Sequence, residues 1–412
     1  MAKRPPAGTL PVFDIDDADG IKAFYAAQGL AVVRVLTPQM CDELVLEQWE
    51  RIILKQPWAP GYKVRVRSHA DGPVLDPQAD RDSFLKVVTS PLSKSTLKEY
   101  GKGWCLHRGF GACCDPAVFH LPGVWKVRED PRLYNLASKL VGAKELWVDV
   151  NRSIQKLPGE GESEFLHWDL NPFAPKDATD GGPTILCGKV CYTPSRFVAV
   201  KGTHTSEFFA QFQAEYAQHY PDVKASAAKF GLDFTKPDPL RLVERQREFA
   251  VPAGCMVVWS ERLLHGQVKT PLDSPIEHGC YVGFFPAGSR ARYKKVCGVE
   301  ERDDRLASYR EGRAPLLWPS FDQIQFYPKR FKNFPNLLQA YIDKMPAGHP
   351  SITTRQTGNG KTVPHLEPWR EQGYAPPALS PLGRKLLGLD EWGEDGSNGV
   401  GGAVGQGAKA GA

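Results

Sequence analysis

The sequence predicts a mainly β domain that also carries helices. Residues 251–259 begin with a Pro and Gly turn and continue as an apolar run, and residues 280–285 form another apolar run before Pro286. Short apolar runs bounded by Gly and Pro are typical of buried strands. In a third segment His167 and Asp169 are two residues apart, a spacing that puts both side chains on one face of a strand. These observations favour strands that gather functional side chains from distant parts of the chain.

The other elements follow from capping residues and from the spacing of apolar residues. Helices are expected over residues 17–27, 37–54, 130–142 and 205–230. Strands are expected over residues 31–36, 145–154, 196–200, 251–259 and 280–285. One helix carries an aromatic stripe that we expect to be core and not a substrate pocket: Phe208, Phe209, Phe212 and Tyr216. Residues 57–124 are interrupted by Gly and Pro and favour no particular element.

Two imidazoles and one carboxylate are supplied by His167, Asp169 and the distant His265. His265 follows the apolar run 251–259, so a strand that returns beside the first would bring it to the other two. This ligand set is that of the non-heme Fe(II) oxygenases, in which three coordination positions stay open for an oxoacid and O2. The same set could hold zinc, whose open position more often serves hydrolysis. Trp168, between the two ligands, is expected to point away from the ion or to lie over it from the side.

The order of these segments resembles the phytanoyl-CoA dioxygenase-like branch of the Fe(II)/2-oxoglutarate dioxygenases. The chain has His-Trp-Asp at 167–169, Gly-Gly at 181–182, Lys-Gly-Thr-His at 201–204, and Pro-Ala-Gly at 252–254 before the distal His-Gly at 265–266. The resemblance covers roughly residues 20 to 290. It implies a double-stranded β-helix (jelly-roll) barrel flanked by helices. It also implies oxidation of an organic substrate coupled to decarboxylation of 2-oxoglutarate.

One position departs from the pattern of that family. The family usually has an Arg early in the strand after the distal His, where it clamps the far carboxylate of 2-oxoglutarate. Here that position falls near Glu277 or His278, and no Arg is present. A protonated His278 is the first candidate to replace the Arg, and Lys269 is the second. The other cations that could reach the oxoacid are Arg262, Lys189 and Lys156.

Three more side chains are candidates for contacts with the cosubstrate or the substrate. Gln267 is two residues past the distal His, where the family often has a polar contact to the oxoacid. Trp168 and Tyr192 are candidate walls of the pocket. The resemblance alone supports the position of Gln267.

Composition limits the compartment and the partners. The 412 residues are 42% hydrophobic, which permits a sizeable core, and no apolar stretch is long enough to cross a membrane. The N-terminus is basic but lacks the apolar segment of a secretory signal. The nine Cys are scattered and odd in number, as in reduced proteins, and they lack the spacing of a structural zinc site. We therefore expect a cytoplasmic protein, with a nuclear one also open.

The net charge of +5, from 52 basic and 47 acidic side chains, is too small to predict nucleic-acid binding. Residues 290–295 and 326–332 form basic clusters with nearby aromatic residues, and acidic residues lie between them. A solvated surface of mixed charge is the expectation for this region.

Residues 1–392 are expected to form a single domain, in which the Pro-rich, aromatic segment 305–385 wraps the barrel. Residues 393–412 are rich in Gly and are expected to be a disordered tail. The expected function is hydroxylation of a small organic molecule by Fe(II), O2 and 2-oxoglutarate. Two alternatives stay open: a nucleic-acid base-modifying Fe(II) dioxygenase with another cosubstrate such as ascorbate, and a non-catalytic binding protein of the same fold.

Overall fold

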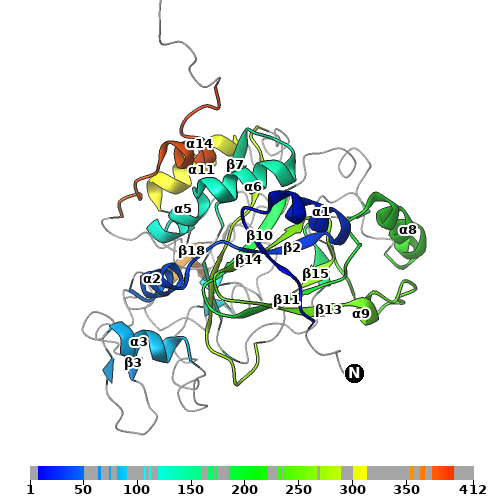
Figure 1. The fold of residues 1–412 in the computed structure, drawn as a ribbon, viewed down its shortest axis with the longest axis horizontal. Helices are drawn as coiled ribbons and strands as arrows, with labels where there is room; N and C mark the ends of the chain where they lie inside the picture. Colours follow the sequence, from blue (N-terminus) through cyan, green and yellow to red (C-terminus); the bar gives the residue numbers. More distant parts are fainter. Residues whose placement is uncertain are drawn as a thin grey trace, which may run out of the picture.

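Two β-sheets with helices around them form the part of the chain that the structure describes (Figure 1). The computed structural model describes residues 8–50, 64–65, 74–75, 81–90, 106–107, 111–112, 119–151, 153–156, 158, 166–170, 172–173, 185–220, 230–233, 235–266, 270–288, 300–312, 352–356, 362–366 and 374–393. Within these residues no helix has the length and the apolar character needed to cross a bilayer.

The larger sheet has eight strands, of which six are in the order β1-β2-β14-β10-β16-β8, and β17 pairs with both β10 and β7. Neighbouring strands are antiparallel, except that β1 and β2 are parallel. The strands are β1 (Val12–Asp14), β2 (Leu30–Arg34), β7 (Leu146–Val148), β8 (Ser153–Lys156), β10 (Leu186–Cys191), β14 (Cys255–Ser260), β16 (Glu277–Tyr281) and β17 (Phe284–Pro286).

The smaller sheet has five strands in the order β12-β9-β15-β11-β13, all antiparallel to their neighbours. Its strands are β9 (Leu166–Trp168), β11 (Ser195–Ala199), β12 (Phe230–Gly231), β13 (Arg247–Val251) and β15 (His265–Gly266). Three two-stranded sheets complete the β-structure: β3 (Val64–Arg65) with β4 (Val74–Leu75), β5 (Leu106–His107) with β6 (Gly111–Ala112), and β18 (Ile352–Gln356) with β19 (Thr362–Leu366).

The two large sheets face each other across a shared apolar layer. Val32 and Val257 of the larger sheet belong to the same buried cluster as Phe197 and Phe249 of the smaller sheet. The chain alternates between the sheets from β8 to β11 and again from β13 to β16, which brings distant segments side by side. Among the described residues the architecture is mixed α/β and the sheets do not close into a barrel, so the expected fold class holds in this coarser form.

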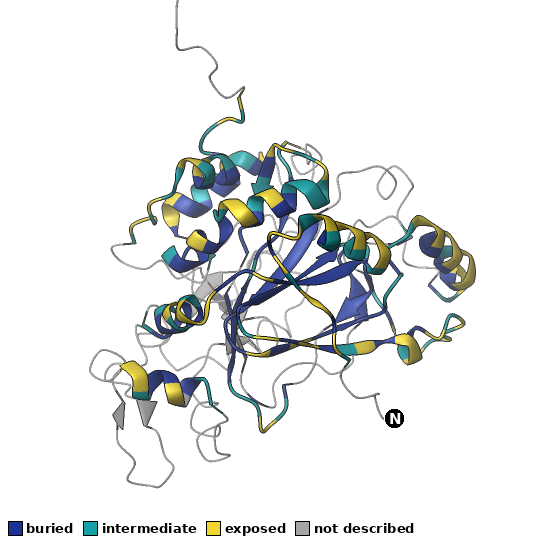
Figure 2. Cartoon of the chain, viewed as in Figure 1, coloured by how far each residue is buried: buried dark blue, intermediate teal, exposed yellow. Residues whose placement is uncertain are grey.

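Helices cover the other face of the larger sheet, where they form the main core (Figure 2). The helices that join this core are α1 (Ala18–Gln28), α2 (Pro38–Gln48), α3 (Arg81–Val88), α5 (Pro122–Arg128), α6 (Pro131–Val141), α11 (Glu301–Glu311) and α14 (Pro381–Leu387). The smaller sheet instead carries α8 (Ser206–Tyr216), the 3-10 helix Ala217–His219 and α9 (Leu242–Arg245). Figure 1 shows α5, α6, α11 and α14 gathered at one end.

Local signals fix the ends of these helices. Thr37 accepts a hydrogen bond from the backbone N–H of Met40 (3.3 Å), and Pro38 occupies the first helical position of α2. Asp130 caps α6 in the same way, and Gly142 ends it with a left-handed φ of 78°. The expected helices therefore match α1, α2, α6 and α8, although residues 51–54 and 221–229 lie outside the described part.

Three expected strands are each broken in the structure. Residues 280–285 form the end of β16 and the start of β17, and residues 145–154 form β7 and the start of β8. Residues 251–259 form the end of β13 and most of β14, with a turn at 252–254 between them. The turn at 252–254 crosses from the smaller sheet to the larger one, so one apolar run serves both sheets. Apolar periodicity gives no information about which sheet a strand joins.

Candidate metal centre

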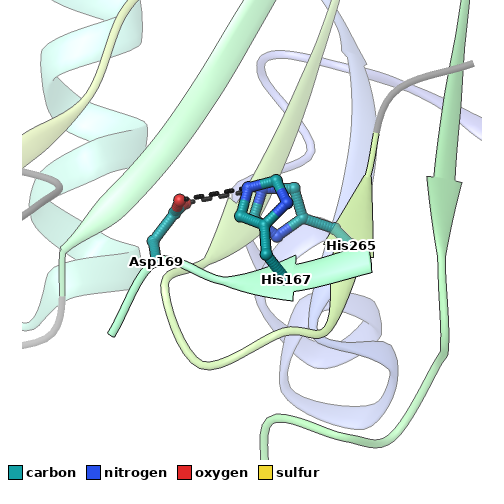
Figure 3. Close-up of side chains that lie close together, drawn as sticks. All are labelled: His167, Asp169 and His265. Atoms are coloured by element: carbon teal, nitrogen blue, oxygen red, sulfur yellow. Dashed lines mark ion pairs between the residues drawn. The ribbon is translucent and has the colours of Figure 1, made fainter. Parts of the chain in front are cut away.

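Strand pairing brings the three candidate ligands together (Figure 3). β9 and β15 are antiparallel neighbours, and in their register His265 lies opposite His167. Asp169 directly follows β9, and its backbone N–H donates to the carbonyl of Glu261 (3.2 Å) in the turn before β15. Two segments that are distant in sequence are thereby held together at His167 and at Asp169.

The geometry of the group suits a metal ion. Nε2 of His167 lies 3.5 Å from Oδ1 of Asp169, and Nε2 of His265 lies 3.5 Å from Oδ2. The two imidazole centroids are 4.3 Å apart, and the three ligand atoms all lie within 4.8 Å of one another. All three side chains are buried, with exposed fractions of 4–5%. The sequence-based prediction that these residues converge is therefore confirmed by their positions.

Hydrogen bonding prepares His265 to bind a metal. Its Nδ1 lies 2.9 Å from the carbonyl oxygen of Leu263. A carbonyl oxygen can only accept, so Nδ1 carries the proton and Nε2, which faces Asp169, presents its lone pair. Metal-binding histidines are commonly oriented by such a bond from the second ring nitrogen. Two imidazoles and one carboxylate in a buried site fit a divalent transition metal.

The thiol of Cys187 lies beside this group, on the facing strand β10. Burial first, and then the nearby charge of Asp169, raises the pKa of Cys187 well above its usual value. Cys187 is therefore a protonated, neutral neighbour of Asp169 at physiological pH. The sequence did not single out this residue, because only the pairing of the two sheets places it there.

The face of β9 that carries Trp168 is not the face that carries the ligands. Trp168 is fully buried and packs against Phe212 (centroids 4.6 Å apart) and Phe209 (6.1 Å) of α8. This packing agrees with the expectation that Trp168 points away from the ion, and it is contrary to the expected contact between Trp168 and a cofactor. It agrees with the expectation that the aromatic stripe of α8 is core. Tyr192 likewise belongs to the cluster beneath the helices, on the face of the larger sheet that is turned away from the ligands.

His278 is held as a neutral ring by two hydrogen bonds. The indole N–H of Trp49 donates to its Nε2 (3.0 Å), and its Nδ1 lies 3.1 Å from the carbonyl of Ile276, to which it donates. Burial lowers the pKa of His278 to about 4. No ring proton is left for an oxoacid carboxylate, which is contrary to the expectation that a protonated His278 replaces the Arg.

The other side chains predicted to contact the oxoacid do not all lie together. Gln267 and Lys269 lie outside the described residues, so their expected roles stay predictions. The guanidinium of Arg262 lies over the ring of Phe209 (4.5 Å), on the side of α8. The structure instead brings together Lys189 and Lys156, which were further candidates, around Glu277.

These three side chains form a buried charge cluster between strands β8, β16 and β10. Nζ of Lys156 lies 3.1 Å from Oε2 of Glu277, and Lys189 forms an ion pair with Oε1 of the same carboxylate. Lys189 also donates to the hydroxyl of Ser195 (2.6 Å). The exposed fractions of Lys156, Lys189 and Glu277 are 5%, 7% and 4%. Burial of such charges is tolerated only when they are paired.

The pKa shifts in this cluster describe its charge. Burial raises the pKa of Glu277, but Lys156 and Lys189 outweigh it and hold that pKa at about 2. Burial alone would lower the pKa of Lys189, whereas Glu277 raises it above its usual value. For Lys156, burial and the nearby Lys189 lower the pKa against the effect of Glu277. Glu277 and Lys189 are thus charged, and Lys156 is the less basic partner.

No protein-family model matches the chain, and no curated protein matches it. Several solved structures are similar to it at low identity. The chain is 17% identical to the epimerase SnoN in complex with Fe3+, alpha ketoglutarate and nogalamycin RO, with 66% of this chain and 84% of that chain covered and a TM-score of 0.34. It is 13% identical to HygX from Streptomyces hygroscopicus with nickel and 2-oxoglutarate bound, with 65% of this chain and 87% of that chain covered and a TM-score of 0.39. It is 13% identical to EvdO2 from Micromonospora carbonacea var. aurantiaca complexed with 2-oxoglutarate, with 68% of this chain and 93% of that chain covered and a TM-score of 0.33.

Proposed function

We propose that this protein is an Fe(II)- and 2-oxoglutarate-dependent oxygenase that acts on a small organic molecule. The supporting observation is the buried group of His167, Asp169 and His265, whose ligand atoms lie within 4.8 Å of one another. Two imidazoles and one carboxylate on one side of an octahedral ion leave three positions for an oxoacid and O2. Iron bound there would supply the oxidising chemistry, while the chain binds, orients and excludes water.

The strand order supports a double-stranded β-helix as the fold. Eight strands, β8 to β11 and β13 to β16, are divided equally between two facing sheets, and the chain repeatedly crosses from one sheet to the other. Jelly rolls are built from eight strands in two sheets in this manner. The phytanoyl-CoA dioxygenase-like branch remains the one whose order of motifs the chain shares.

Lys189 is our candidate for the cation that binds the far carboxylate of 2-oxoglutarate. Cys187, Lys189 and Cys191 are alternate residues of β10, and both cysteines belong to the layer between the sheets. Cys187 lies beside Asp169, so Lys189 follows about 7 Å further along the same face, at the usual strand rise of ~3.4 Å per residue. That separation suits a five-carbon dicarboxylic acid whose other end binds the metal.

The charge of the cluster is suited to a carboxylate ligand. Two lysines share one carboxylate, Glu277, which stands where the family usually has its Arg. The oxoacid would bring the second negative charge, and its arrival would favour the protonated form of Lys156, whose pKa is lowered in the protein without ligand. Glu277 would then hold both lysines in place, and Lys189, which donates to Glu277 and Ser195, would offer its third N–H to the ligand.

The proposed cosubstrate can be tested with a panel of 2-oxoglutarate, other oxoacids and ascorbate, scored by release of succinate and CO2. We expect 2-oxoglutarate with Fe(II) to support turnover, and we expect His167→Ala, Asp169→Ala and His265→Ala to abolish it without unfolding the protein. Absence of turnover with every oxoacid, together with an iron spectrum that 2-oxoglutarate does not perturb, would contradict the proposal and favour the non-catalytic alternative.

The lysine can be tested separately with Lys189→Met, which removes the charge and keeps most of the volume. A charge-assisted hydrogen bond contributes about 1.5–3 kcal/mol, so the concentration of 2-oxoglutarate needed for half-maximal turnover should rise about ten- to a hundred-fold. Lys139→Met is the matched control, because Lys139 forms its ion pair with Asp19 at the surface. An unchanged requirement in folded Lys189→Met would remove Lys189 from the oxoacid site.

The nucleic-acid alternative depended on the missing Arg and on residues 290–295 and 326–332, and these residues lie outside the described part of the chain. It remains a prediction whose first requirement is DNA binding that weakens as salt rises.

A further inference from the structure

Trp259 of β14 contacts two of the three candidate metal ligands. Its indole N–H donates to Oδ2 of Asp169 (3.2 Å), and its ring lies 5.1 Å from the ring of His265. Phe197 packs on both rings, 5.0 Å from Trp259 and 5.7 Å from His265, and is stacked on the imidazole at 15°. The indole is 4% exposed, so this hydrogen bond is shielded from water.

The backbone holds Trp259 firmly in this position. β14 lies between β2 and β10, and Trp259 is opposite Leu30 on one side and Cys187 on the other. Its side chain belongs to the layer between the sheets, together with Val257 two residues earlier. A ring fixed by two strand ladders and an aromatic neighbour can set the direction of a hydrogen bond.

We infer that Trp259 is a positioning residue that makes Asp169 bind metal through one oxygen only; the inference rests on the proposed metal site. Oδ1 of Asp169 lies 3.5 Å from Nε2 of His167 and Oδ2 lies 3.5 Å from Nε2 of His265, so these distances favour neither oxygen. The indole N–H donates to Oδ2 and takes up one of its lone pairs, which makes Oδ2 the weaker donor to a metal and leaves Oδ1 as the preferred one.

The number of coordination positions gives this contact a function. An octahedral ion with two imidazoles and one carboxylate oxygen keeps three open positions. If Asp169 bound through both oxygens, two would remain, which is too few for a bidentate oxoacid and O2 together. Hydrogen bonds to the outer atoms of metal-binding side chains commonly change metal affinity when they are removed.

Titration of the metal-free protein with Co(II), followed by calorimetry and by the visible spectrum, tests the inference without turnover. Trp259→Phe keeps a large ring and removes the N–H, and it should weaken Co(II) binding about 10- to 100-fold and alter the Co(II) spectrum. Trp392→Phe is the matched control, because it removes an indole hydrogen bond of similar length (3.0 Å, to the carbonyl of Leu146) outside the site. It should leave both readouts unchanged.

Trp259→Gln, which retains an N–H donor without adding an imidazole that could itself bind metal, should lose less affinity than Trp259→Phe, and it tests the inference if the Phe variant does not fold. The inference would be overturned if Trp259→Phe kept the parental affinity and spectrum, or if Trp259→Phe and Trp392→Phe lost affinity equally. It would also be overturned if the Gln variant bound Co(II) no better than the Phe variant. A parent that binds no Co(II) would also overturn it. If Co(II) affinity depends on Trp259 but 2-oxoglutarate does not perturb the Co(II) spectrum, the inference stands and only the proposed function is contradicted.

Discussion

The surroundings of His278 determine its protonation state. Trp49 and the carbonyl of Ile276 take up its two ring nitrogens, and burial lowers its pKa to about 4. The preceding residue, Glu277, points to the opposite face of the same strand and has a pKa of about 2 because two lysines surround it. Adjacent residues of β16 thus differ in function because a strand turns alternate side chains to opposite faces.

The stability of the protein should therefore depend on pH through His278. The folded state binds the proton more weakly than the unfolded chain, so the stabilisation from neutral His278 is complete above pH 6.5 and is lost as the pH falls towards about 4. For this fully buried group the change is on the order of 3 kcal/mol. His278→Gln does not titrate, so the difference in unfolding free energy between parent and variant should shrink over that range.

Urea unfolding of both proteins between pH 7 and pH 4 measures this difference, and a difference independent of pH would contradict the assignment of a neutral His278. The same variant should leave the 2-oxoglutarate requirement unchanged, because the ring faces the helical core and not the space between the sheets.

At the scale of the element, β16 joins the core to the candidate oxoacid site. It pairs with β10 on one side and with β8 on the other, and these two strands carry Lys189 and Lys156. Gly279 permits the close approach of β10, because a Cβ at this residue would lie 2.3 Å from the carbonyl oxygen of Val190. The cluster depends on this close packing of three strands.

Gly279→Ala should accordingly destabilise the protein by about 1–3 kcal/mol, as overpacking in a core does. It should also raise the 2-oxoglutarate requirement, because a shift of β16 moves Glu277 relative to both lysines. Denaturant unfolding and the succinate assay measure the two effects. Gly393→Ala serves as the control, since a Cβ there meets no atom within 4 Å. If Gly279→Ala had the same unfolding free energy as the parent, β10 and β16 would be able to move apart without loss of stability, and the prediction would be wrong.

At the scale of the whole molecule, the C-terminal segment is attached to the sheet region. The indole of Trp392 donates to the carbonyl of Leu146 in β7 and stacks on Tyr134 of α6 (5.6 Å). Arg305 of α11 is buried and donates to the carbonyl oxygens of Val148 (2.6 Å) and of Leu386 and Leu387 in α14. These contacts connect β7, α6, α11 and α14, and a single domain over residues 1–392 stays a prediction.

Truncation tests where that domain ends. Deletion of residues 393–412 should leave the melting temperature and any turnover unchanged, because a Gly-rich segment buries little apolar surface. Deletion of residues 392–412 also removes Trp392 and should lower the melting temperature by a few degrees. A clear drop after the shorter deletion would show that the tail is bound to the domain, and no drop after the longer one would show that Trp392 is not an anchor.

The sequence by itself determined the candidate metal ligands and the ends of several helices. His167 and Asp169 follow the two-residue repeat of a strand, and Thr37 and Gly142 are local signals for the start and the end of a helix. Such features depend on residues close together in the chain, so they can be inferred without a fold. His265 was found because it follows an apolar run at a turn.

The tertiary structure alone decided the surroundings of the site. Lys156, Lys189 and Glu277 come from three strands that meet only in the larger sheet, and Trp259 reaches Asp169 from the facing sheet. His278 was misplaced because its face depends on the register of β16 against β8 and β10. A register shift of one residue would exchange the faces of Glu277 and His278, and this register is set by pairing between strands distant in sequence.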